Sequence, residues 1–161
     1  MRERRDNELV RPLLPRPFSQ DTYCCPVSLR RITVAVQKPI VVVGSINTDL
    51  VAVTERIPAV GETVIGTDFQ IHPGGKGANQ AVAVARLGYP VRLIGRLGSD
   101  PFGAQLRTHL ESAGVDIAGI ATSEGTSGVA VILVSCEGEN SIVVTPGANS
   151  KVTPHDLLNI A

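Results

Sequence analysis

Residues 72–88 read HPGGKGANQAVAVARLG, a glycine-rich loop that runs directly into a series of small apolar residues. The series predicts a helix over residues 77–88 that ends at its final glycine, because glycine readily adopts the conformation that terminates helices. The loop is not a P-loop, since Gly77 rather than Ser or Thr follows Lys76. It is not a dinucleotide fingerprint either, since Gln80 stands where a third glycine is required. The glycines therefore predict close backbone approach to a partner that need not be a phosphate.

Strands and helices are expected to alternate on both sides of this loop. Residues 40–45 (IVVVGS) form a continuous apolar run, which is typical of a parallel strand buried on both faces. Residues 91–98 predict another strand. Asp100 followed by Pro101 then predicts the start of a helix that ends before Gly114. Alternation of this kind indicates an α/β domain.

Two pairs of strands stand outside this alternation. Residues 50–56 and 63–71 flank a Pro/Gly turn and predict a hairpin, with Gly66 as a candidate for a bulge. Residues 128–135 and 141–149 predict a second hairpin around a tight turn.

The ends of the chain differ from its centre. Residues 1–38 carry eight Lys and Arg against four Asp and Glu, and none of the 16 glycines. Residues 39–161 have the opposite balance, seven basic against eleven acidic residues. We therefore predict a disordered extension over residues 1–38 and an ordered domain over residues 39–161. A helix predicted at residue 153 has few residues after it, so the chain is expected to be the front part of a larger domain.

Composition argues against several classes of protein. The hydrophobic share of 43% and zero net charge suit a globular fold. No apolar run approaches the length of a membrane span, and the basic tail lacks the interleaved aromatic residues of a nucleic-acid reader. The three cysteines, Cys24, Cys25 and Cys136, match neither a disulfide framework nor a zinc site. We expect no membrane or nucleic-acid partner, and a reducing, cytoplasmic setting.

Three polar segments fall where an α/β sheet usually places its ligand, after a strand or at the start of a helix. They are GSINTD (44–49), GGKGAN (74–79) and PGAN (146–149). Asn47 and Asp49 share a face if the backbone there is extended. With Lys76 and Asn79 they supply a carboxylate, an ammonium and amides, a set that suits a polyhydroxyl ligand. Asp49 is the expected anchor, because hydrogen bonds to a charged group contribute about 1.5–3 kcal/mol each.

Each of these residues also has a plainer explanation. Asn47 and Asp49 are common turn residues, and a lysine such as Lys76 is usually solvated. The coincidence of three polar segments favours a binding site over these explanations. The three histidines have no metal-ligand spacing, so no metal site is predicted.

From residue 40 onward the chain resembles the PfkB family of carbohydrate kinases, and within it the ribokinases. The resemblance is carried by VVVGSINTDLV (41–51), GETVIGTDFQIHPGGKGANQAVAVARLG (61–88), VRLIGRLGSDPFGAQLRTHLESAGVD (91–116) and PGAN (146–149). It implies a ribokinase-like three-layer αβα fold with a mainly parallel sheet. It also implies a small β-lid formed by strands at about 50–71 and 128–145.

The resemblance further implies an ATP- and magnesium-dependent enzyme that converts D-ribose to D-ribose 5-phosphate, with a monovalent cation and a homodimer formed through the lid. Matching positions assign sugar binding to Asn47, Thr48, Asp49, Gly75, Lys76, Gly77, Ala78 and Asn79. The family's Gly-Ala-Gly-Asp turn, which carries the catalytic aspartate, has no match in the chain. No catalytic residue is therefore assigned, and the ATP and metal ligands are expected to lie outside this sequence.

These expectations describe the sugar-binding half of a kinase, truncated before its C-terminal half and inactive alone. Two alternatives stay open. The chain could be a non-catalytic sugar-binding or dimerising module, or it could belong to a kinase for another sugar or a nucleoside. An in-frame Gly-Ala-Gly-Asp turn in the downstream DNA would distinguish a kinase from a free-standing module.

Overall fold

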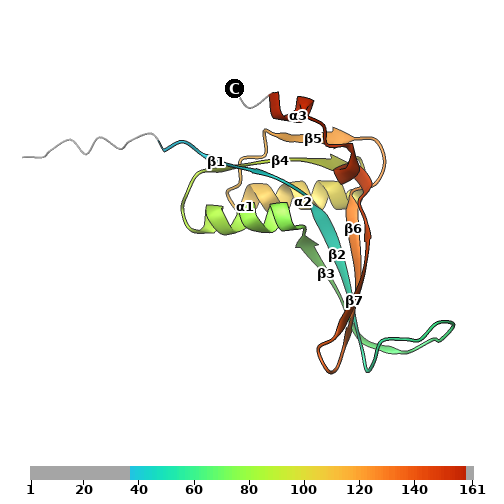
Figure 1. Cartoon of the computed structure of the whole chain (residues 1–161). Helices are drawn as coiled ribbons and strands as arrows, with labels where there is room; N and C mark the ends of the chain where they lie inside the picture. The colour runs from blue at the N-terminus through green and yellow to red at the C-terminus, as the bar shows by residue number, and fades with distance from the viewer. Residues whose placement is uncertain (1–36, 159–161) are drawn as a thin grey trace, which may run out of the picture. The chain divides into compact units, whose positions relative to one another are not determined.

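The computed structural model describes residues 37–158. One part of the fold is a parallel sheet with helices on both faces. The sheet consists of β1 (Ile40–Val43), β4 (Val91–Gly98) and β5 (Ile120–Ser123), in the order β1-β4-β5. Helices α1 (Lys76–Arg86) and α2 (Pro101–Ser112) lie on one side, and the short α3 (His155–Leu158) lies on the other (Figure 1). This arrangement matches the expected αβα layers.

Local sequence signals account for the ends of both long helices. The Asp100 side chain accepts a hydrogen bond from the Gly103 N–H at 2.8 Å and caps α2, with Pro101 in its first turn. Gly88 and Gly114, each two positions after the last residue of its helix, have φ values of 78° and 82°. Such left-handed values favour glycine, so both helices stop where the sequence predicts.

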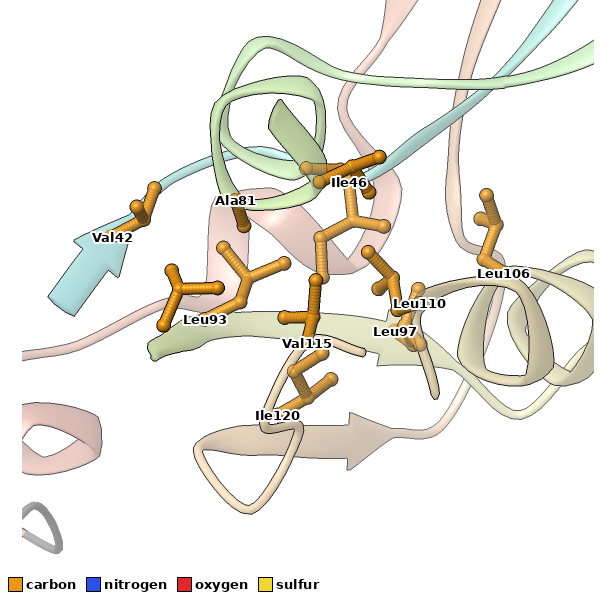
Figure 2. Packing of buried hydrophobic residues seen from close by; sticks show 12 residues of the cluster. Val42, Ile46, Ala81, Leu93, Leu97, Leu106, Leu110, Val115 and Ile120 are labelled. Carbon is orange, nitrogen blue, oxygen red and sulfur yellow. The ribbon is translucent and has the colours of Figure 1, made fainter. Parts of the chain in front are cut away.

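One hydrophobic core joins α1 and α2 to the sheet (Figure 2). Leu93 and Leu97 of β4 pack with Ala81 of α1 and Leu110 of α2, and Ile46 completes the cluster beside them. These five side chains are almost fully buried. Burying a leucine or isoleucine side chain contributes about 1.5–3 kcal/mol. The core therefore holds the start of α1 against the residues that follow β1.

The predicted hairpins combine into one four-stranded sheet, which we call the lid sheet. It contains β2 (Asn47–Thr54), β3 (Gly66–Gly74), β6 (Gly128–Ser135) and β7 (Asn140–Thr145), in the order β3-β2-β6-β7. Both hairpins are antiparallel, and β2 and β6 join them in parallel. The register shifts between Val53, which faces Asp68, and Thr54, which faces Gly66, so the predicted bulge occurs beside Gly66.

The structure corrects two details of the parallel sheet. The run at residues 40–45 is not buried on both faces: Val41 and Val43 are 41% and 51% exposed, and only Val42 enters the core. The reason is that β1 lies at the edge of the described sheet and α1 covers only one of its faces. The sequence reading also missed β5, because this strand has only four residues, with polar residues at half of its positions.

The structure does not describe most of the N-terminal segment. The predicted disordered extension over residues 1–38 lies outside the described residues except for residues 37 and 38, and it stays a prediction. Among the helices within residues 37–158, none combines the length and the apolar character needed to cross a membrane.

Candidate functional site

A hollow of about 320 Å³ lies between the start of α1 and one face of the lid sheet. One wall is polar and consists of Asn47, Asp49, Lys76, Asn79 and Asn149. The facing wall is aliphatic and consists of Ala130, Ile132, Ile142 and Val144 of β6 and β7. The two walls fit a small ligand that has both hydroxyl groups and a C–H face.

Five of the eight predicted sugar-binding residues line this hollow: Asn47, Asp49, Gly75, Lys76 and Asn79. The other three lie elsewhere. Thr48 points to the opposite face of β2, as alternate strand residues do, and faces a smaller hollow beside α2. Gly77 and Ala78 are buried, with Ala78 in the hydrophobic core. The structure thus brings the side chains of Asn47, Asp49, Lys76 and Asn79 together around one hollow. It directs the Thr48 hydroxyl to another hollow and buries Gly77 and Ala78.

Asn47 and Asp49 lie within β2 and are not turn residues. The β-strand periodicity therefore places both side chains on the face that meets the hollow. The register also pairs Asp49 with His72 of β3. The backbone of this pair is extended, as a shared face requires.

The Asp49 carboxylate is the most unusual charged group of the hollow. It is half-buried, and within residues 37–158 it has no hydrogen-bond or ion-pair partner. Burial raises the pKa of the Asp49 carboxyl above its ordinary value, and the nearby His72 opposes part of that rise. A half-buried carboxylate without a donor has unused capacity to accept hydrogen bonds from a ligand.

The glycine at the end of β3 makes room for this carboxylate. A Cβ atom built on Gly74 would come within 2.5 Å of Cγ and both carboxylate oxygens of Asp49. Gly74 itself is buried and does not have a left-handed φ. We conclude that this glycine is needed for space rather than for backbone conformation.

The next two loop glycines serve the approach of α1 to the chain after β1. Gly75 has a φ of 94°, and a Cβ there would lie 2.6 Å from the Ser45 carbonyl oxygen. A Cβ on Gly77 would lie 2.7 Å from the carbonyl carbon of Gly44. The predicted role of these glycines in exposing the backbone to a ligand stays a prediction, and Gly75 lines the hollow. At all three positions the space is occupied by the protein's own atoms.

Lys76 and Asn79 are exposed and project from the first turn of α1. Residues three apart lie on the same face of a helix, so both side chains reach the same side of the hollow. The Asn79 backbone N–H donates to the Gly75 carbonyl at 2.9 Å, which continues the helix up to the loop. Neither side chain has a hydrogen-bond partner within the described residues.

Asn149 is the residue whose importance the sequence reading underestimated. It belongs to the PGAN segment, which was noticed, but its partners are more than 100 positions away in the sequence. It lies in the 3-10 helix η1 (Gly147–Lys151) and accepts a hydrogen bond from the Ile46 N–H at 2.9 Å. Its Nδ2 donates to the Ile46 carbonyl at 3.0 Å and to Oδ1 of Asn47 at 2.8 Å. Only the fold brings these groups together.

Comparison with known proteins identifies relatives of this chain. Residues 37–161 match the model of the pfkB family carbohydrate kinases. The chain is 46% identical over 120 residues to the ribokinase of Bacillus subtilis (strain 168), and the match covers 74% of this chain and 41% of that relative. It is 40% identical over 119 residues to a deoxyribokinase of Salmonella typhi, covering 73% of this chain and 39% of the relative.

A solved structure supports the same relationship. The Arabidopsis thaliana ribokinase complexed with ribose and ATP matches with a TM-score of 0.63 and 40% identity, over 70% of this chain and 37% of that one. The chain thus spans about two fifths of the length of the relatives it matches. The predicted ribokinase-like α/β fold is confirmed. With the family model matching most of its length, the chain belongs to the pfkB family of carbohydrate kinases.

Proposed function

We propose that this chain provides the sugar-binding part of an ATP-dependent ribokinase, which converts D-ribose to D-ribose 5-phosphate. The single observation that carries the proposal is the half-buried Asp49 carboxylate, which has no partner among residues 37–158 and faces the same hollow as Lys76 and three asparagines. Sugars offer adjacent hydroxyl donors, and an ionised carboxylate can accept from two of them at once.

The remaining groups of the hollow complement this anchor. Lys76 can donate to hydroxyl oxygens, and the Asn47 and Asn79 amides can both donate and accept. The aliphatic wall, with Ile132 and Val144, can cover the C–H face of a sugar ring. A site that pairs hydroxyl groups discriminates against analogues that lack them, because its own polar groups are then left without partners.

The relatives favour a pentose but do not decide between two of them. The Bacillus relative is a ribokinase and the Salmonella relative a deoxyribokinase, at similar identity to this chain. Ribose is the preferred substrate here because the polar wall offers several hydrogen-bonding groups within a hollow of modest size. A kinase for another sugar or a nucleoside is the alternative.

ATP is the proposed phosphoryl donor, since the Arabidopsis relative was solved with ribose and ATP. Magnesium and a monovalent cation are part of the proposal by family resemblance. Phosphoryl transfer depends on groups that surround and neutralise the phosphates. Within residues 37–158 no three Asp, Glu, His or Cys side chains are grouped to hold a metal ion. We assign the described residues no step of the transfer.

We also propose that the lid sheet pairs two copies of the chain. Ile71, Leu50, Val131 and Val143, one from each lid strand, stand side by side in the register on the face away from the hollow. Ile71, Val131 and Val143 are 52%, 45% and 66% exposed. An apolar row of this kind is typical of a surface that another protein covers. A role limited to sugar binding or dimerisation is the second candidate function.

Titration calorimetry with D-ribose, 2-deoxy-D-ribose and adenosine tests the sugar assignment on the purified chain. We expect ribose to bind most tightly, and an equal response to all three ligands, or none, would contradict the proposal. A coupled assay for ribose 5-phosphate tests the assignment of catalysis. We expect no turnover from this chain alone, and rates of roughly 1–100 s⁻¹, typical of kinases, would show that it contains the catalytic groups.

A further inference from the structure

We infer that Asn149 is a positioning residue that turns the Asn47 amide so that its NH₂ group, and not its oxygen, faces the sugar hollow. This inference rests on the proposed sugar-binding function and adds a hydrogen-bond polarity to the site. It concerns how Asn47 is presented, and Asn149 itself need not touch the sugar.

The orientation of Asn149 follows from the backbone of Ile46. An N–H group can only donate and a carbonyl oxygen can only accept, so these two groups leave no choice of partner. The atom that accepts from the Ile46 N–H at 2.9 Å must be Oδ1. The atom that donates to the Ile46 carbonyl at 3.0 Å must be Nδ2. The usual ambiguity between the two ends of an amide therefore does not arise for Asn149.

The orientation of Asn47 follows in turn. Nδ2 of Asn149 has a second hydrogen, and the atom of Asn47 that lies 2.8 Å away must accept it. That atom is Oδ1, so the NH₂ group of Asn47 is directed elsewhere. Asn47 is buried and lines the hollow, where its NH₂ group can donate to a sugar oxygen. Asp49 on the same face only accepts when ionised, so the strand presents a donor and an acceptor side by side.

Two further features keep this contact in place. The turn that carries Asn149 is anchored by the Ala148 N–H, which donates to the Thr126 carbonyl at 2.9 Å. Gly128 faces Asn47 across the β2–β6 pair. A Cβ on Gly128 would come closer than 2.5 Å to Nδ2 of Asn149 and to Oδ1 of Asn47. Glycine at this position thus leaves the space in which the two amides meet.

The test uses the full chain and begins without any sugar. Hydrogen exchange of the side-chain NH₂ groups, followed by NMR, should be slow for Asn149, whose two hydrogens are both donated, and fast for Asn47. Adding D-ribose should slow the exchange of the Asn47 NH₂ group. A protected Asn47 NH₂ group in the sugar-free protein would overturn the inference, whether or not ribose binds.

Asn149→Asp tests the orientation of the Asn47 amide directly. The new carboxylate can still accept from the Ile46 N–H, but it can no longer donate to Asn47. The Asn47 amide should then turn over and donate to Asp at position 149, which protects its NH₂ group before ribose is added. Loss of one donor should weaken ribose binding by about tenfold. Binding within twofold of the wild type would refute the inference.

Ser150→Ala is the matched control, because the Ser150 hydroxyl donates to the Gly147 carbonyl of the same turn and has no other hydrogen bond among the described residues. Ser150→Ala should leave the ribose affinity and the exchange of the Asn47 NH₂ group unchanged. A loss of affinity equal to that of Asn149→Asp would show that both substitutions act through general damage to the turn. If Asn149→Asp does not fold, Gly128→Ala separates the two amides instead. It should make both NH₂ groups exchange fast and lower ribose affinity, and an unchanged affinity would count against the inference. Failure of the wild type to bind ribose would reject the proposed function alone.

Discussion

Gly74→Ala is the substitution that tests the sugar anchor most directly. Gly74 has no left-handed φ, so alanine is compatible with its backbone. The added Cβ would come within 2.5 Å of Cγ and both oxygens of the Asp49 carboxylate, whereas ordinary contacts are about 3.5–4.0 Å. Asp49 has a short, flexible side chain at the rim of a hollow. We therefore expect its carboxylate to move away by about 1 Å or more while the strand pairing survives.

The displacement should cost most of the binding contributed by Asp49. Two charge-assisted hydrogen bonds to sugar hydroxyls are worth about 2–4 kcal/mol in this setting, allowing for partial replacement by water. This corresponds to ribose affinity lower by roughly 30- to 800-fold. The pKa of the Asp49 carboxyl should also fall toward its ordinary value, because burial is the main cause of its rise.

Calorimetry gives the affinity, an NMR titration of the carboxyl carbon gives the pKa, and thermal melting reports on the fold. Gly66→Ala is the control, since it makes the same substitution in the same strand, with a Cβ 3.2 Å from the Val53 carbonyl and away from the hollow. Gly66→Ala should bind ribose as the wild type does. Wild-type affinity in Gly74→Ala, together with a pKa that is still raised, would show that Asp49 does not depend on this space.

Three further predictions concern stability and assembly. Asp49→Asn should weaken ribose binding yet raise the melting temperature of the sugar-free chain at pH 7. The pKa of the Asp49 carboxyl is raised in the folded state, so the wild-type chain loses stability as pH rises through that pKa and the carboxyl ionises. Asparagine carries no such charge, and a lower melting temperature would contradict this reasoning. Asp156 has a pKa lowered to about 2, chiefly by its hydrogen bond from Arg96. The ionised Asp156 carboxylate should therefore stabilise the folded state fully above about pH 4, and this stabilisation should be lost as pH falls toward 2. Asp156→Asn should remove that pH dependence from melting temperatures measured in acid. Val143→Lys places a charge on the apolar row and should convert a lid-mediated dimer into a monomer. Light scattering at micromolar concentration measures the mass of the particle, and a mass equal to that of the wild type would place the contact elsewhere.

Much of the architecture follows from short-range signals in the sequence. Asp100 and Pro101 start α2, and Gly88 and Gly114 end the two long helices, because caps and left-handed residues act on their nearest neighbours. Alternating hydrophobic residues identified both hairpins of the lid sheet. The polar segments that contain Asn47, Asp49, Lys76 and Asn79 could be recognised as a candidate site for the same reason, since residue type and spacing are local properties.

The tertiary structure decided which of these segments meet. Pairing of β2 with β6 joins the two hairpins, although about 80 residues separate the paired positions, and nothing within either hairpin specifies that partner. The exposure of β1 depends on which helices cover it, and the orientation of the Asn47 amide depends on Asn149, 102 positions later in the chain. Even the loop glycines had a local signal but a tertiary cause, because the atoms that exclude a Cβ belong to β2 and to the residues just before it. Steric contact and hydrogen bonding act at a few ångströms in space, whatever the separation along the chain, so only the folded arrangement reveals them.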